Sequence, residues 1–252
     1  ISTLTELINE QKSRQQNQSI EREEAQMNQQ DEANGQHDVV DTIAIDEQNL
    51  KTVNLTLLTT SVCDIHPVPE FKNSPEMTTV NIPFGETKID LQSFIGYSLL
   101  TNVTIPSSVL VIGDSSFYGC SSLTQIIIPN SVEVICRSAF SNCTSLSGIV
   151  IPTSVTAIGD SCFYGCTSLK KLVIPSSVKK LENSTFYGCF SLEEVLLPSS
   201  LMTIGNQVFY ECSMLNKINI PPFVSLIGSF TFYGCSSLTQ LDLPSSLTTI
   251  EE

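Results

Sequence analysis

Residues 151–173 read IPTSVTAIGDSCFYGCTSLKKLV, and variants of this 23-residue stretch follow one another along most of the chain. A phenylalanine keeps the same step from Phe94 to Phe232, and a cysteine keeps it from Cys120 to Cys235. A proline recurs at Pro83, Pro106, Pro129, Pro152, Pro175, Pro198, Pro221 and Pro244. Three residue types that share one period indicate a stack of equivalent units, each of which contacts only its neighbours.

Each unit carries the pattern of one turn of a solenoid. Leu172 and Ile174 alternate with outward positions as a half-buried β-strand requires, and Pro175 ends that strand because proline has no N–H group to donate. Residues 178–181 then return apolar side chains to the interior from the opposite side, and Phe186 fills the middle of the coil. We expect a strand on one side of every coil, irregular or short 3₁₀ segments on the other side, and a parallel sheet with strands about 4.8 Å apart.

The consensus L-x-x-[IVL]-x-[IVL]-P-x-S-[VL]-x-x-[IL]-G-x-x-x-F-x-x-C-x-S resembles the BspA-type leucine-rich repeat, which is also called the Treponema-type class. The resemblance covers residues 71–252 and includes six full copies between Ile105 and Asp242. It implies a leucine-rich repeat solenoid, an α/β-type right-handed superhelix with a parallel β-sheet on its concave face and irregular or 3₁₀ segments on its convex face. It also implies a role in cell-surface attachment, in binding host matrix proteins or in an interaction scaffold, because those roles are associated with the family.

Three segments of the chain differ in composition. Residues 1–37 are rich in Gln, Asn, Glu and Ser, and we interpret them as a polar arm that is either helical or disordered. Residues 38–70 contain apolar residues without the 23-residue pattern, and we expect them to form an N-terminal cap because the open end of a solenoid exposes its core. The solenoid spans residues 71–252 and begins with a half-formed repeat, in which Met77 and Val80 occupy the later Leu and Ile positions.

The chain is acidic, with a formal net charge of −14 over its 252 residues. Phosphate backbones and anionic lipid surfaces repel such a chain, so we expect no nucleic acid partner and no direct binding to lipid. No apolar run approaches the roughly 18 residues that span a membrane, so we expect no integral membrane span.

The sequence offers no site for catalysis or for a cofactor. The serines belong to the repeated turns, no G-x-S-x-G motif is present, and the two histidines, His37 and His66, lie outside the regular repeats. The repeated cysteines lie one per coil, so they do not converge on a metal ion. We interpret them as a column of buried, reduced thiols, with disulfides between neighbouring coils as the alternative. We therefore expect no enzyme, no cofactor and no metal.

The outward strand positions form the candidate binding surface. At one of these positions four consecutive coils carry apolar residues, Ile127, Val150, Val173 and Leu196, between polar residues at both ends of the column. Exposed apolar strips mark interaction sites, although β-sheet propensity alone also explains aliphatic residues on a sheet.

Charged and aromatic residues extend this surface. Lys170, Lys171, Glu193 and Glu194 flank the apolar strip, and we expect them either to pair across neighbouring strands or to orient a docked protein. A column of tyrosines follows the core phenylalanines, and it is either part of an interface or a cover over the seam between coils.

We expect a non-catalytic module that binds a protein partner through the concave sheet face, as an adhesin or as a scaffold. The alternative is a self-assembling structural protein that associates through its coil ends or its N-terminal arm, and the abrupt end of the last repeat suggests an end-to-end homodimer. The many thiols favour the cytoplasm or the inner side of a membrane, with the cell surface as the alternative. Two glycosylation sequons, at Asn142 and Asn183, fall in tight repeat positions where a glycan would crowd the next coil.

Overall fold

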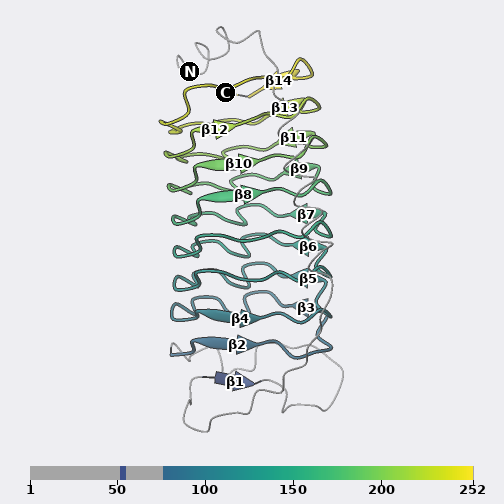
Figure 1. Cartoon of the computed structure of the whole chain (residues 1–252), viewed down its shortest axis with the longest axis vertical. Coiled ribbons are helices and arrows are strands. Elements are labelled where there is room, and N and C mark those ends of the chain that lie inside the picture. Colours follow the sequence, from purple (N-terminus) through teal and green to yellow (C-terminus); the bar gives the residue numbers. More distant parts are fainter. Residues whose placement is uncertain (1–51, 55–75, 252) are drawn as a thin grey trace.

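The computed structural model describes residues 52–54 and 76–251. In this range the chain winds into coils that stack in one nearly straight column (Figure 1). Short strands are joined by turns, and the described residues contain no helix. The strands form only parallel pairs between coils, so the predicted fold class, a solenoid with a parallel sheet, is confirmed.

One side of the coils carries a ladder of strands that we call the first ladder, with each coil supplying one rung. Thr79 pairs with Asn102 and Glu194 pairs with Lys217, so each residue faces its equivalent in the next coil. At the coils between β4 and β8, an isolated parallel bridge joins Ile127 to Val150. The strands of the first ladder are β1 (Thr52–Asn54), β2 (Thr79–Asn81), β4 (Asn102–Thr104), β8 (Lys171–Val173), β10 (Glu194–Leu196) and β12 (Lys217–Ile218).

A second ladder occupies the side where the sequence predicts irregular or 3₁₀ segments. Because neighbouring coils are spaced as strands in a sheet, even two extended residues pair with their equivalents in the adjoining coils. The remaining connections are turns, and none of the described residues is in a 3₁₀ helix. The strands of the second ladder are β3 (Lys88–Ile89), β5 (Val111–Ile112), β6 (Val134–Ile135), β7 (Ala157–Ile158), β9 (Lys180–Leu181), β11 (Thr203–Ile204), β13 (Leu226–Ile227) and β14 (Thr249–Ile250).

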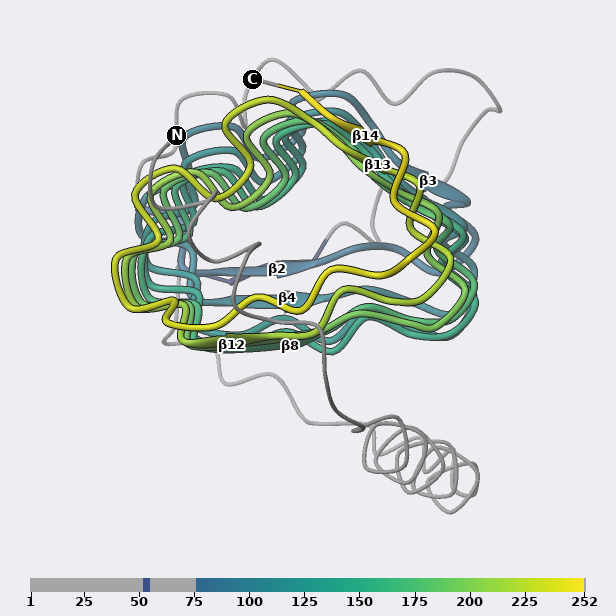
Figure 2. The same cartoon turned by 90° about the horizontal axis from the view of Figure 1, so that it is seen from above.

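Inward side chains form continuous columns along the stack, and Figure 2 shows the coils superposed when seen down the column. Leu172 and Ile174 are buried, as the alternation predicts. The phenylalanine rings of successive coils stack from Phe94 to Phe232, with centroids 5.2–5.7 Å apart. Met77 is buried as well, so the half-formed first repeat fills the core positions expected of it.

The cysteine column lies beside the phenylalanine column and is bonded to it. Cys189 Sγ donates a hydrogen bond to Phe163 O at 3.1 Å, and equivalent bonds recur along the column from Cys120 to Cys235. Burial raises the pKa of Cys120 to about 12, so this thiol keeps its proton at neutral pH. The described cysteines are unbridged, which agrees with the interpretation as buried thiols, and Cys63 lies outside the described residues.

The predicted N-terminal segments are described only at one point. Strand β1 falls within residues 38–70 and adds a rung to the first ladder, because Thr52 pairs with Thr79 in β2. The rest of the expected cap and the whole of the expected arm, residues 1–37, lie outside the described residues. Both assignments therefore stay predictions.

Candidate interaction surface

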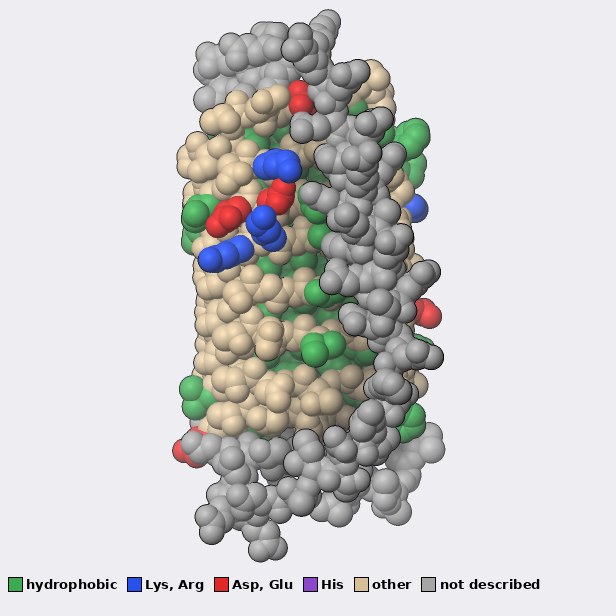
Figure 3. Space-filling model, in the orientation of Figure 1, with side chains coloured by type: hydrophobic (Ala, Val, Ile, Leu, Met, Phe, Trp, Pro, Cys, Tyr) green, Lys and Arg blue, Asp and Glu red, His purple; other side chains and the backbone are tan. Residues whose placement is uncertain are grey.

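The first-ladder face, by which we mean the outward residues of the first ladder, is positioned by strand alternation. In β10 the side chain of Val195 is buried, so Glu194 and Leu196 lie on the outer side. Residues in register then form outward columns, because Glu194 pairs with Lys171 and Leu196 pairs with Val173. Figure 3 shows this face, with a cluster of charged side chains above hydrophobic patches.

The predicted apolar strip is one of these outward columns. Ile127 exposes 83% of its surface and Val150 exposes 65%, and the isolated bridge joins the two residues. Val173 and Leu196 pair on the next two rungs, where both are half-buried. The structure thus brings all four residues onto consecutive rungs, with the strongest exposure at the N-terminal end of the strip. Their role in binding stays a prediction.

Glu194 lies between two lysines on the adjoining rungs. Its Oε1 is 2.9 Å from Lys217 Nζ, and its Oε2 is 3.2 Å from Lys171 Nζ. The hydrogen bond from Lys217 has the largest effect and lowers the pKa of the Glu194 carboxyl; partial burial opposes it and Lys171 reinforces it. Lys217 is not among the predicted site residues, although the 23-residue step from Glu194 leads to it.

Lys170 and Glu193 occupy the neighbouring outward column. Glu193 N donates a hydrogen bond to Lys170 O at 2.8 Å, which places the two residues on adjacent rungs. Lys170 is exposed and Glu193 is half-buried, and no ion pair between their side chains occurs among the described residues. Cross-strand ion pairing therefore explains only Lys171 and Glu194 among the four predicted charges.

The tyrosines that directly follow the core phenylalanines in the sequence form a stack of rings along the coils. Tyr164, Tyr187, Tyr210 and Tyr233 stack with centroids 4.5–4.8 Å apart. The inner two rings are half-buried, and the outer two, Tyr164 and Tyr233, are exposed. Because the inner rings present both faces to their neighbours, the arrangement favours a cover over the seam between coils.

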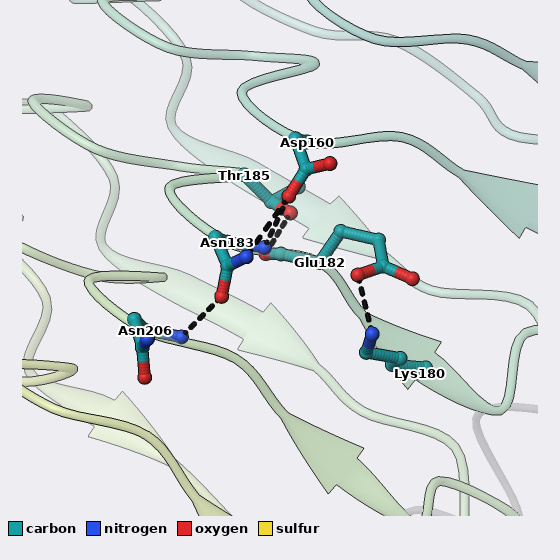
Figure 4. Close-up of polar contacts among 6 residues, drawn as sticks. All are labelled: Asp160, Lys180, Glu182, Asn183, Thr185 and Asn206. Carbon is teal, nitrogen blue, oxygen red and sulfur yellow. Dashed lines mark hydrogen bonds and ion pairs between the residues drawn. The ribbon is translucent and has the colours of Figure 1, made fainter.

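A polar ladder runs along the corner after the second ladder (Figure 4). Asp160 Oδ1 accepts hydrogen bonds from Asn183 N and Asn183 Nδ2, both at 3.1 Å, and Asn183 Oδ1 accepts one from Asn206 N at 2.8 Å. Nearby, Lys180 Nζ lies 2.6 Å from Glu182 Oε2. The Asn183 amide is therefore part of the contact between coils, in agreement with the expectation that a glycan there would crowd its neighbours.

The described part of the chain offers neither a metal site nor a membrane-spanning helix. Among residues 52–54 and 76–251 no three His, Cys, Asp or Glu side chains are placed to hold a metal ion. His37 and His66 lie outside these ranges. Within the described residues, no helix has the length and apolar character needed to cross a membrane.

The register of the ladders and the buried Leu, Ile, Phe and Cys columns define a leucine-rich repeat protein. The family model for the BspA type leucine rich repeat region matches residues 67–190 and 156–252, with 6 copies. The chain belongs to this family, as its consensus indicated, and the family provides repeat modules suited to protein interaction.

The chain is also similar to solved structures of leucine-rich repeat proteins. The T. pallidum leucine-rich repeat protein is 33% identical, with a TM-score of 0.59, over 64% of this chain and 77% of that chain. A leucine-rich repeat protein from Bacteroides ovatus is 26% identical over 70% of this chain and 61% of that chain, with a TM-score of 0.42. A leucine-rich cell surface protein from Faecalibacterium prausnitzii is 25% identical over 69% and 61%, respectively, with a TM-score of 0.49. No curated protein matches the chain.

Proposed function

We propose that this chain is a non-catalytic module that binds a protein partner through the first-ladder face, as an adhesin or as a scaffold. The observation that carries the proposal is the pair Ile127 and Val150, which expose 83% and 65% of their surfaces on adjacent rungs. Covering such aliphatic side chains removes apolar surface from water, which favours association. The leucine-rich repeat family, whose members are typically not enzymes, supports a binding role over catalysis.

The geometry of the strip suits a flat or extended partner. The four residues of the strip, Ile127, Val150, Val173 and Leu196, lie on consecutive rungs. With strands about 4.8 Å apart, the strip is roughly 15 Å long. Toward the C-terminal coils, Lys171, Glu194 and Lys217 together carry one net positive charge in a chain whose net charge is −14. We infer a partner that lays apolar side chains over the strip and places an acidic group near the lysines, where charge contacts set orientation more than affinity.

The test replaces the two most exposed residues of the strip. We expect the double variant Ile127→Asp and Val150→Asp to bind the partner at least tenfold more weakly, because carboxylates would have to be desolvated in the interface. Partners captured by the wild-type chain are purified, and their affinities for both proteins are compared by calorimetry. Both positions face water, so the variant should remain folded and should lose about 1 kcal/mol or less from the like charges on paired rungs.

Phe223→Asp is the matched control. Phe223 exposes 66% of its surface but lies in the turn between β12 and β13, outside the strands of the first ladder. We expect this variant to bind as the wild type does. Equal binding by all three proteins would contradict the proposal, and so would an equal loss in the control. Self-assembly through the coil ends stays a separate prediction, which a concentration-dependent mass in solution would support.

A further inference from the structure

The apolar strip on the first-ladder face has two unlike halves. In its N-terminal half, Ile127 and Val150 expose 83% and 65% of their surfaces. In its C-terminal half, Val173 and Leu196 are both half-buried. Each half is two rungs long, so a more exposed apolar half is followed by a more covered one.

The outward positions beside the strip differ between the same two halves. Beside the exposed half the outward residues are uncharged, and they are Thr124, Gln125, Ser147 and Gly148. Beside the covered half they are the four charged residues, Lys170, Lys171, Glu193 and Glu194 (Figure 3). At Gly148 an added Cβ would meet no atom within 4 Å, so the space outside this rung is open. Long charged side chains thus flank one half of the strip, and an open position flanks the other.

We propose, on the basis of the function proposed above, that the first-ladder face binds a second copy of this chain. The two copies lie face to face, and their columns run in opposite directions. A two-fold axis parallel to the strands, placed between the rungs of Val150 and Val173, generates this arrangement. Such an axis brings the same surface of both copies together, which is the commonest symmetry of soluble homo-oligomers.

The axis matches apolar residues with apolar residues. Val150 lies opposite Val173 of the second copy, because both are half a rung from the axis. Ile127 lies opposite Leu196 of the second copy, because both are one rung further out. The exposed half of each strip therefore meets the covered half of the other. All four residues of both strips leave water together, which favours association.

The same axis gives the charged side chains room and uncharged neighbours. Lys171, whose side chain is 68% exposed, lies opposite Gly148 of the second copy, where the space is open. Glu194 lies opposite Gln125 of the second copy, whose amide can donate a hydrogen bond to a carboxylate. A two-fold axis along the column would instead set Lys171 against Lys171, and like charges disfavour that contact. The charge pattern therefore selects columns that run in opposite directions.

Sedimentation velocity of the full chain tests whether the dimer forms. The strip covers only four rungs, so the interface is small and we expect a weak dimer. The average mass should rise toward that of a dimer between about 10 µM and about 1 mM chain. A monomeric mass over this whole range would overturn the proposal.

Gly148→Lys and Gly148→Glu are the deciding variants, because they place opposite charges at the same open position. The φ of Gly148 lies outside the left-handed region, so both side chains suit its backbone. Residue 148 faces Lys171 of the second copy on both sides of the axis. We expect Gly148→Lys to dimerise at least tenfold more weakly than the wild type, and Gly148→Glu to dimerise as tightly or more tightly. Equal dissociation constants for the two variants would overturn the proposal, because an end-to-end dimer does not depend on this position.

Thermal unfolding shows whether both variants are folded. If either is not, Ser147→Lys and Ser147→Glu replace the pair, with the same expectation, because Ser147 is exposed and faces Lys170 of the second copy. The double variant Ile127→Asp and Val150→Asp separates this proposal from the general one. A monomeric wild type whose captured partner is lost in the double variant would overturn only the second copy as occupant. A dimer that survives in the double variant would place the contact elsewhere and overturn the proposal.

Discussion

Each repeated cysteine from Cys120 to Cys235 adds a thiol hydrogen bond to the coil before it. Phe163 O accepts a hydrogen bond from Cys166 N at 3.1 Å and a second from Cys189 Sγ at 3.1 Å, so both of its lone pairs are used. The sequence could predict that these cysteines are buried, because they share the core period. It could not predict the thiol bond, because the acceptor belongs to another coil and its position depends on how the coils stack.

Because the thiols are buried, the free energy of unfolding should fall at alkaline pH. Burial raises the pKa of Cys166 from 9.0 to about 12. Below pH 9 this thiol is protonated in both states, so its contribution is fully present there; at higher pH the unfolded chain loses a proton that the folded chain keeps. We expect the free energy of unfolding to fall by about 1.4 kcal/mol per pH unit for each such thiol. Urea unfolding between pH 7 and 11 measures the slope.

Cys166→Val is the control for this prediction. The variant lacks the titrating group, so its free energy of unfolding should fall less steeply with pH above 9 than that of the wild type. Equal slopes for the two proteins would show that the Cys166 thiol is not the group responsible.

At the level of the strands, the two ladders differ in how far sequence could predict them. The first ladder was predictable because Leu172 and Ile174 alternate with outward residues. The second was not, because a strand such as β9 contains only Lys180 and Leu181, which is too short to show alternation. Its pairing comes from the coil spacing, which no single unit encodes.

The candidate site could likewise be predicted only in part from the sequence. The four apolar residues could be assigned to one column from the 23-residue step alone. Their unequal exposure could not, because Val173 and Leu196 are half-buried by their surroundings whereas Ile127 is open. The shared role of Glu194, which pairs with lysines on both sides, likewise depends on side-chain distances across rungs.

Ile126 and Ile127 test the assignment of inner and outer faces. They are the same residue type, adjacent in sequence, yet Ile126 is 5% exposed and Ile127 is 83% exposed. We expect Ile126→Asp to cost several kcal/mol, about 3 or more, because it buries an unpaired carboxylate, and Ile127→Asp to change stability by about 0.5 kcal/mol or less. Thermal unfolding of the two variants gives the comparison, and similar losses in both would contradict the assignment.

The Lys171–Glu194–Lys217 cluster should contribute little stability. The lysine side chains are 68% exposed and the Glu194 side chain is 19% exposed, so solvent screens the pairs. We expect Glu194→Gln to lower the free energy of unfolding by about 1 kcal/mol or less at neutral pH and low salt. Because folding lowers the pKa of Glu194, its contribution is present at neutral pH and is lost as the pH falls through the folded pKa.

Urea titrations of the wild type and Glu194→Gln measure this difference. The gap between the two proteins should narrow at acidic pH, where Glu194 is protonated in both states, and again in 1 M salt. A gap that stayed constant under all three conditions would mean that the loss comes from packing rather than from charge.

At the level of the whole molecule, stability comes from contacts between neighbouring coils. Phe163 is fully buried between Phe140 and Phe186, with ring centroids 5.7 Å and 5.6 Å away. Phe94 is only partly buried, and among the described residues the phenylalanine that it stacks on is Phe117. The Phe163 ring is therefore covered by a phenylalanine ring on each side, and contacts of this kind between neighbouring coils build up the stability of the column.

Alanine substitutions should show this gradient. We expect Phe163→Ala to cost about 3–5 kcal/mol and Phe94→Ala to cost less, because the second ring is incompletely buried to begin with. In the Phe163→Ala variant, amide hydrogen exchange should show that the coils next to Phe163 lose protection first. Equal costs for the two substitutions would argue against stability built up from neighbour to neighbour.

The hydrogen bonds of both ladders run between successive coils, as in the pairs β8 with β10 and β9 with β11. A force that pulls the two ends of the column apart would therefore break the hydrogen bonds of one coil after another rather than all of them at once. Each coil that peels away frees 23 residues, or about 80 Å of slack. Held between two bodies, the molecule would act as an extensible tether that yields in equal steps and rewinds when the tension is released.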